Sequence, residues 1–318
     1  MRYSDAKKKA ASELKAAGIE EAEVDAEYLL LVATGLERSS LFVKLYEEMP
    51  KREAEIFEKL VERRADHEPL QYIIGSTEFM GYSFIVTQDV LIPRFDTEIL
   101  AELAVKRSLE AIKAKPGFWQ KTDSEEAGLK VLDLCTGSGC VAVSVGFTVM
   151  EKLLKNDKKY SENIFISVTG ADISKEALEI AGRNFELNLQ KSIFDMTGCK
   201  IDFLESDLFS LVKGKFHIIT ANPPYIVRNE IQDLMPEITE HEPHLALDGG
   251  DDGMDFYRRI CREAPGYLFS GGRLIMEFDD SQAEPVGDMM REAGFAEIEV
   301  HRDLAGLRRV IEGVITEK

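Results

Sequence analysis

This 318-residue sequence has far fewer positively charged residues than negatively charged ones. It holds 39 Lys and Arg against 58 Asp and Glu, which gives a formal net charge of −19. Proteins that bind long stretches of phosphate backbone do so through Lys and Arg. The charge therefore disfavours a nucleic-acid-binding protein, although it leaves room for a local basic patch, and we expect no direct nucleic-acid binding.

Long apolar runs and paired cysteines are also missing. No segment approaches the ~18 consecutive apolar residues of a membrane helix, so we expect no membrane association. The four cysteines, Cys135, Cys140, Cys199 and Cys261, form no Cys-x-x-Cys pair. Lys7–Lys9 are not followed by the apolar stretch of a secretory signal. We therefore expect reduced thiols and a cytoplasmic protein.

Residues 1–75 predict a small helical bundle. Gly or Pro follows each expected helix, as is typical of helix ends, and the four ranges are Ala6–Ala17, Glu21–Thr34, Ser39–Glu48 and Lys51–Asp66. Apolar residues at spacings of three and four suggest its inner face, namely Val24, Tyr28, Leu31, Ile56 and Leu60.

The remainder predicts a different architecture. In residues 76–92, apolar and polar side chains alternate on either side of Gly81, which predicts a β-hairpin linker. After a helix at Asp96–Lys113 and an exposed linker at Lys115–Gly128, strands alternate with helices up to residue 318. This pattern indicates an α/β fold with a doubly wound parallel sheet in a domain of residues 93–318. Ala296–Arg302 and Arg309–Ile315 lie close in sequence, so we expect an antiparallel hairpin at one edge.

Asn222-Pro223-Pro224-Tyr225 follows a short apolar strand at Phe216–Ala221. A residue before proline is extended, so Asn222 should lie at the carboxyl end of that strand, where open α/β sheets bind ligands. Its side-chain carbonyl and the nearby backbone carbonyls suit a planar NH₂ group, with Tyr225 available to pack on its face. The alternative is a turn that only ends the strand.

A second candidate site is a buried strand that runs into the glycine-rich turn Asp133-Leu134-Cys135-Thr136-Gly137-Ser138-Gly139. Gly137 and Gly139 allow a tight turn and close approach of a ligand to the backbone. Asp133 is placed to pair with a cationic ligand rather than a pyrophosphate. The alternative is a turn kept only for packing.

Two further carboxylates end the next strands. Asp172 is placed to bind two ribose hydroxyls, as in nucleoside-binding sheets, or to cap the following helix. Asp207 is placed to meet an adenine amino group, with Leu208 and Phe209 beside the ring, or to cap a turn. His241 and His244 are separated by a proline, which disfavours a metal site on a helix, so we expect no metal.

Together these residues resemble a class I S-adenosylmethionine-dependent methyltransferase with a Rossmann-like sheet. More closely, the sequence resembles the HemK/PrmC family of peptide-chain release factor N5-glutamine methyltransferases. The resemblance covers nearly the whole chain, and the segments that carry it are Glu68–Gly75, Leu91–Glu98, Asp133–Gly139, Asn222–Tyr225, Glu242–Gly250 and Arg302–Gly306. It implies that residues 1–75 recognise a substrate protein.

The resemblance also implies roles for individual residues. S-adenosylmethionine would be the cofactor, bound by residues at Asp133, Cys135, Thr136, Gly137, Ser138, Gly139, Asp172, Asp207, Leu208 and Asn222. Asn222, Pro223 and Tyr225 would be catalytic, and Asn222–Tyr225 would bind the substrate. The substrate would be the Gly-Gly-Gln loop of a release factor, and we expect a monomeric enzyme. The Asn222 and Pro223 carbonyls would accept the two N–H bonds of the glutamine amide, so that direct methyl transfer depends on positioning and electrostatics.

The sequence departs from the usual pattern of this family at three places. Phe95 replaces a usual proline, Leu208 stands where some relatives have tryptophan, and Glu277–Gln282 lacks a usual glycine. The Asp279-Asp280 pair would place two carboxylates in a loop on the active face. Asp248–Gly253 lacks a calcium-loop pattern and predicts a flexible loop.

The alternatives to this function are glutamine methylation of a ribosomal protein, N6-adenine methylation of nucleic acid, and a non-catalytic cofactor-fold scaffold.

Overall fold

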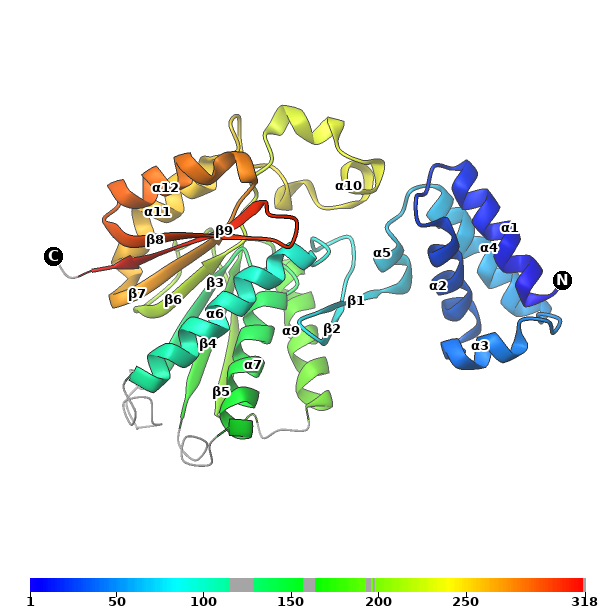
Figure 1. The fold of residues 1–318 in the computed structure, drawn as a ribbon, viewed down its shortest axis with the longest axis horizontal. Coiled ribbons are helices and arrows are strands. Elements are labelled where there is room, and N and C mark those ends of the chain that lie inside the picture. The colour runs from blue at the N-terminus through cyan, green and yellow to red at the C-terminus, as the bar shows by residue number, and fades with distance from the viewer. Residues whose placement is uncertain (115–127, 157–163, 193–195, 197, 317–318) are drawn as a thin grey trace. The chain divides into compact units, whose positions relative to one another are not determined.

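The computed structural model describes residues 1–114, 128–156, 164–192, 196 and 198–316 (Figure 1). Almost all of the predicted Lys115–Gly128 linker therefore lies outside the described residues. The chain divides into two compact units. Unit 1 comprises Met1–Thr77, Val86–Gln88 and Asp233–Glu242, and unit 2 comprises Glu78–Ile85, Asp89–Gln232 and Pro243–Lys318.

Unit 1 is helical. Its helices are α1 (Tyr3–Ala16), α2 (Ala22–Thr34), α3 (Arg38–Lys44), α4 (Lys51–Ala65), α5 (Leu70–Ile74) and α10 (Pro236–His241). Gly35 and Gly75 end α2 and α5 with left-handed φ values of 65° and 82°, which glycine adopts without a Cβ clash. Buried Asp25 and Arg64 form an ion pair at 2.6 Å, and Arg64 also binds Glu237 of α10 at 2.6 Å. The short segment 233–242 is thus part of this unit, which the sequence pattern did not predict.

The buried face of unit 1 differs in part from the predicted one, although Leu31 and Leu60 are partly buried and pack against its core as expected. Val24 and Tyr28 are 44% and 42% exposed, and Ile56 is 38% exposed. Helix α2 is apolar at many successive positions, so local spacing did not distinguish its two faces. Contact with the neighbouring helices decides the choice, and the buried core instead contains Leu14, Ala26, Leu29, Leu30, Phe57 and Val61.

Unit 2 is built on a seven-stranded sheet with the order β5-β4-β3-β6-β7-β9-β8. The strands are β3 (Leu129–Leu134), β4 (Ile166–Asp172), β5 (Cys199–Glu205), β6 (Phe216–Ala221), β7 (Leu268–Glu277), β8 (Phe295–Arg302) and β9 (Arg308–Ile315). Strands β3 to β7 are parallel, and β9 pairs antiparallel with both β7 and β8. The predicted doubly wound sheet and its antiparallel edge hairpin are confirmed.

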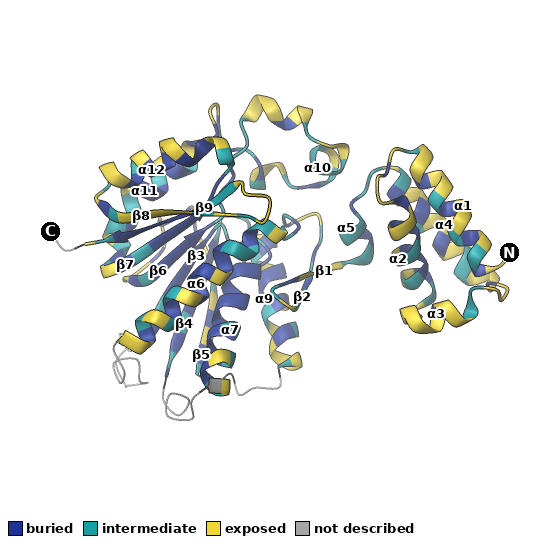
Figure 2. Ribbon diagram, in the orientation of Figure 1, coloured by how far each residue is buried: buried dark blue, intermediate teal, exposed yellow. Residues whose placement is uncertain are grey.

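Helices cover both faces of this sheet (Figure 1). One face carries α6 (Phe95–Ala114), α7 (Cys140–Asn156) and α9 (Lys175–Lys191), and the other carries α11 (Asp255–Tyr267) and α12 (Ala283–Glu292). A separate apolar core fills each side, one around Phe147 and Leu100, the other around Tyr257 and Phe278. The central strands β3 and β6 are largely buried, whereas β8 at one edge is mostly exposed or half-buried, and the outer helix faces are exposed (Figure 2). Buried central strands are expected when both faces of a parallel sheet are covered.

The remaining elements are short. Strands β1 (Ser76–Phe79) and β2 (Tyr82–Ile85) form a hairpin around Met80 and Gly81, whose φ values of 53° and 79° suit a tight turn. Residues 86–92 of the predicted hairpin are not strand. In the described part of the chain, the 3₁₀ helices are η1 (Arg228–Asp233), η2 (His244–Ala246) and η3 (Asp280–Gln282). Among the described helices, none is long and apolar enough to cross a membrane.

Candidate active site

A cavity of about 260 Å³ lies at the carboxyl ends of the central strands of unit 2. This is the edge where open α/β sheets bind ligands. Residues predicted from sequence that line it are Asp133, Cys135, Thr136, Gly137, Ser138, Asp172, Asp207, Leu208, Asn222 and Pro224. Side chains that the sequence argument gave no role also line it, among them Arg94, Thr97, Phe256 and Arg259. The structure therefore brings most of the predicted site residues together.

The glycine turn after β3 forms one wall of the cavity. The Gly137 N–H donates to the Asp172 carboxylate at 2.8 Å, so the turn is tied to the end of β4. Gly137 lines the cavity, but Gly139 does not. A Cβ on Gly139 would lie 3.0 Å from the Ala181 Cβ, so this glycine permits close packing on α9. The two glycines thus have different roles, one beside the ligand cavity and one in the core.

Cys135 stands in the same turn with a φ of 55°, a region that non-glycine residues rarely adopt. Leu208 in the opposite wall has a φ of 49°. Both residues line the cavity, and such backbone strain is concentrated at functional sites. Burial, followed by the charges of Asp172 and Asp133, raises the pKa of the Cys135 thiol well above its usual range. The thiol is therefore neutral and unsuited to act as a nucleophile.

Asp133 is a buried carboxylate that hydrogen-bonds to two hydroxyls. Thr136 donates to one oxygen at 2.5 Å and Thr220 donates to the other at 2.7 Å. Burial raises the pKa of Asp133 to about 6, and the hydrogen bonds only partly oppose this effect. No cation pairs with Asp133 among the described residues, so its charge is available to a cationic ligand.

Asp172 at the end of β4 accepts backbone N–H groups from Gly137 at 2.8 Å and Ser174 at 2.9 Å. Ser174, rather than Asp172, caps α9 by accepting the Ala177 N–H at 3.1 Å. Burial raises the pKa of Asp172. A carboxylate has about four acceptor sites, so the predicted contact with two ribose hydroxyls is compatible with these bonds.

Asp207 and Arg259, which both line the cavity, form an ion pair at 2.8 Å. Both side chains are partly exposed, and Arg259 comes from α11. Leu208 lines the cavity beside them. Phe209, which we expected beside a ring, instead stacks on Tyr267 in the core, with ring centroids 4.6 Å apart. Core packing takes this residue because β5 ends before it and the following turn faces α11.

Asn222 follows β6 and lines the cavity together with Pro224. The Asn222 Nδ2 donates to the Thr97 hydroxyl at 3.1 Å. Thr97 is buried near the start of α6, within the Leu91–Glu98 segment. Pro223 and Tyr225 are not among the residues lining the cavity. Asn222 is therefore the member of the predicted catalytic set that the structure places in the cavity with a defined side-chain partner.

The glycines of the Asp248–Gly253 loop pack under the Asn222–Tyr225 segment. A Cβ on Gly249 would lie 2.7 Å from the Tyr225 Cα, and one on Gly253 would lie 2.5 Å from the Tyr225 carbonyl oxygen. Backbone hydrogen bonds join Ile226 to Leu247 and Gly249. The loop is thus a packed support, and the prediction of a flexible loop is wrong because sequence alone did not show what the glycines contact.

Two arginines of β9 contact the acidic residues of the Glu277–Gln282 segment. Arg308 binds Asp280 at 3.0 Å, and Asp279 caps η3 and lies 3.8 Å from Arg309. The two carboxylates are thus held by arginines of β9. Phe95 is 83% exposed.

Glu277 is the functional candidate that the sequence argument missed. It ends β7, is 3% exposed, and its Oε2 has no hydrogen-bond partner among the described residues. Burial raises its pKa to about 7, while hydrogen bonding with Thr97 and Asn222 opposes the increase. The signal that could have found it is a carboxylate directly after the apolar run Leu274–Met276, the same pattern that identified Asp172.

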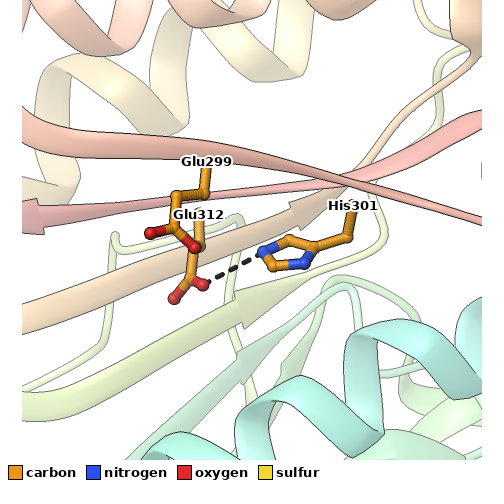
Figure 3. A group of neighbouring side chains, drawn as sticks. All are labelled: Glu299, His301 and Glu312. Carbon is orange, nitrogen blue, oxygen red and sulfur yellow. Dashed lines mark hydrogen bonds and ion pairs between the residues drawn. The ribbon is translucent and has the colours of Figure 1, made fainter.

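A group of metal-ligating residues lies away from the cavity. Glu299, His301 and Glu312 on β8 and β9 have ligand atoms within 4.8 Å of one another (Figure 3). Arg107 binds Glu312 through two nitrogens, and Arg273 binds it at 3.0 Å. Two guanidinium groups already neutralise the central carboxylate, so the group is better explained as an ion-pair network than as a metal site.

The fold and the site define a class I methyltransferase. The catalytic domain of hMettl16, solved with the MAT2A 3′UTR hairpin 6, matches this chain with a TM-score of 0.51 at 13% identity and shows the fold alone. That match covers 81% of this chain and 83% of the other.

Sequence comparison gives the family. The release factor glutamine methyltransferase of Geobacter sulfurreducens is 38% identical over 299 residues, 94% of this chain and 91% of that protein. The same enzyme of Thermodesulfovibrio yellowstonii is 39% identical over 85% of each chain. Residues 5–75 match the PrmC N-terminal domain. The chain belongs to the release factor glutamine methyltransferase family, and the predicted resemblance is confirmed.

Proposed function

We propose that this protein transfers a methyl group from S-adenosylmethionine to the side-chain nitrogen of a glutamine, in the Gly-Gly-Gln loop of a peptide-chain release factor. The observation that supports the proposal is the orientation of the Asn222 side-chain amide. Its Nδ2 is held by Thr97 at 3.1 Å, at the edge of the cavity. This arrangement leaves its Oδ1 as an acceptor for an N–H group of a substrate amide.

The cavity residues fit the cofactor chemically. S-adenosylmethionine supplies a methyl group on a positively charged sulfonium. The cavity is lined by the acidic residues Asp89, Asp133, Asp172 and Asp207 and by two arginines, Arg94 and Arg259, and this excess of negative charge favours a cationic ligand. Asp172 has acceptor sites left for ribose hydroxyls, and Leu208 offers an apolar surface to a base. Gly137 permits close approach to the backbone.

The chain's part in the reaction is mainly to position the amide. The lone pair of an amide nitrogen is delocalised, so the nitrogen is a weak nucleophile. Acceptors at Asn222 Oδ1 and at the Pro223 carbonyl would orient the NH₂ group and stabilise the positive charge that develops on it. Pro223 and Pro224 are buried, and the Tyr225 backbone packs on Gly249 and Gly253, so the Asn222–Tyr225 segment is a rigid support for this task. The methylated amide then loses its proton to water or to a nearby carbonyl.

The remaining assignments follow from this proposal. The helical domain of residues 1–75 would recognise the substrate protein, and residues 76–92, which contain the β1–β2 hairpin, would connect it to the catalytic domain of 93–318. The enzyme would act as a cytoplasmic monomer without binding nucleic acid directly, in keeping with its net charge of −19.

The test is methyl transfer to an unmodified release factor, read by peptide mass spectrometry. We expect one added methyl on the Gly-Gly-Gln peptide, and a loss of at least ~100-fold in rate with Asn222→Ala. A ribosomal protein and a nucleic-acid substrate run in parallel. Methylation of either one, with none on the release factor, would contradict the proposed substrate. An Asn222→Ala variant with the wild-type rate would contradict the proposed mechanism.

A further inference from the structure

Glu277 lies beside Asn222 although 55 positions separate them in the sequence. Strands β6 and β7 are parallel, and their last paired residues are Ala221 and Met276. Asn222 and Glu277 each come one residue later, at the same edge of the sheet. The sheet topology therefore brings a buried carboxylate next to the amide that the proposed function relies on.

Thr97 connects these two side chains. Its hydroxyl accepts from Asn222 Nδ2 at 3.1 Å and keeps its own proton to donate. Interaction with the Thr97 and Asn222 side chains lowers the pKa of Glu277, against the larger effect of burial, so both groups favour its ionised form. Thr97 and Asn222 line the cavity, whereas Glu277 is not among the lining residues. Glu277 therefore stands behind the site and acts on a ligand only through its two neighbours.

The orientation of the Asn222 amide determines what it can recognise. With Nδ2 toward Thr97 and Glu277, the Oδ1 end is left to accept from a substrate NH₂ group. The flipped amide would present its own NH₂ donors to that group, and two donors repel each other. An ionised carboxylate is an acceptor only, so Glu277 favours the productive orientation over the flipped one. Its Oε2, without a partner among the described residues, can accept a further hydrogen bond.

We propose that Glu277 is a positioning residue, which acts together with Thr97 to hold the Asn222 amide with its Oδ1 toward the reacting glutamine. This inference rests on the proposed function. It assigns Glu277 no contact with the substrate and no proton transfer.

The groups around Glu277 leave its charge only weakly compensated. Asp96 of α6 opposes ionisation and Arg309 of β9 favours it. Arg309 lies 3.2 Å from Asp96 and 3.0 Å from Asp303, so its charge is shared. Tyr225 packs nearby, since the charge of Glu277 contributes to raising the pKa of the Tyr225 hydroxyl. With a pKa of about 7, Glu277 becomes an acceptor-only carboxylate as the pH rises through that value.

The experiment measures the single-turnover rate of glutamine methylation, with saturating S-adenosylmethionine, from pH 5.5 to 9. In the full-length wild type we expect the rate to rise through about pH 7. Glu277→Gln keeps the size of the side chain, removes the charge and adds an NH₂ donor. We expect it to lower the rate ~10- to 100-fold at pH 8 and to abolish the rise near pH 7. The affinity for S-adenosylmethionine, measured by calorimetry, should stay within about twofold because Glu277 does not line the cavity.

Thr97 provides a matched pair of variants that leaves Glu277 unchanged. Thr97→Val removes the hydroxyl at nearly constant volume, whereas Thr97→Ser keeps it. We expect Ser to retain a rate at least ~5-fold above that of Val. A Glu277→Gln enzyme with the wild-type rate and pH profile would overturn the proposal, as would equal rates for Thr97→Val and Thr97→Ser. A wild type that methylates no glutamine would overturn the proposed function, and the positioning role with it.

Discussion

Glu277 and Glu312 are buried glutamates on two paired strands, and their environments are opposite. Strands β7 and β9 pair Ile275 with Glu312 and Glu277 with Val310, so the two glutamates are two positions apart in the ladder. They are 3% and 0% exposed. Burial raises the pKa of Glu277 to about 7. Burial acts in the same direction on Glu312, but hydrogen bonds from His301 and Arg107 and the charges of Arg107 and Arg273 lower its pKa to about 2.

The difference shows that burial alone does not determine the state of a carboxylate. Glu312 is held by the guanidinium groups of Arg107 and Arg273 and does not line the cavity. Glu277 is held by neutral groups beside Asn222, at a free-energy cost that the fold tolerates. Uncompensated carboxylates of this kind are concentrated at functional sites.

The largest expected change in the free energy of unfolding comes from breaking the ion-pair network around Glu312. Glu312→Gln leaves Arg107 and Arg273 without their central counter-ion, and both are mostly buried. We expect the free energy of unfolding at pH 7 to fall by about 3 kcal/mol, measured by urea denaturation. The folded-state pKa is lowered, so the wild type's advantage is present above about pH 4.5 and is lost as the pH falls through about 2.

Methylation per folded Glu312→Gln molecule should be unchanged, because the residue does not line the cavity. A variant as stable as the wild type at pH 7 would show that the network contributes nothing, and the contrast with Glu277 would then fail.

At Glu277 we expect the opposite result, a substitution that raises the free energy of unfolding. Glu277→Gln removes a charge that burial penalises, so we expect the free energy of unfolding at pH 8 to rise by about 2 kcal/mol. The folded-state pKa is raised, so the wild type has its full stability from this group below about pH 4.5 and loses it as the pH rises through about 7. The variant's advantage should therefore disappear at low pH. A gain in stability together with a loss of activity would identify a group kept for function.

The smallest effect is expected at the exposed member of the metal-ligating group. The Glu299 side chain is 59% exposed and lies 3.5 Å from Arg107. We expect Glu299→Gln to change the free energy of unfolding by less than about 0.5 kcal/mol, as for other exposed ion pairs. Adding Zn²⁺ should leave the Tm unchanged. A rise in Tm with Zn²⁺ that Glu299→Gln removes would instead indicate a metal site.

The sequence predicted the elements of this fold well, because local signals mark them. Gly35 and Gly75 end α2 and α5, and the apolar strand at Phe216–Ala221 ends where the pattern placed it. Helix α3 instead ends at Lys44, before the predicted end at Glu48. The same logic located Asp133, Asp172 and Asn222, since each follows or ends a buried strand. These predictions needed only the rule that parallel strands present their carboxyl ends at one edge.

Features that depend on distant contacts were missed. Thr97 and Glu277 are 125 and 55 positions from Asn222, and the order of the strands brings them together. The same reason explains the unassigned Arg259, which reaches the cavity from α11 to pair with Asp207. The prediction of the inner face of α2 was wrong for Val24 and Tyr28 because its apolar residues do not by themselves show which side meets the neighbouring helices.

Segment 233–242 has a consequence for protein engineering. The chain leaves unit 2 after Gln232, contributes α10 to unit 1, and returns at Pro243 to line the cavity. A fragment ending at residue 77 would keep Arg64 and Asp25 but lose Glu237, which binds Arg64 at 2.6 Å. The helical unit is therefore not a cassette that a single cut can exchange between relatives. A functional chimaera would have to carry two stretches of sequence from the same parent.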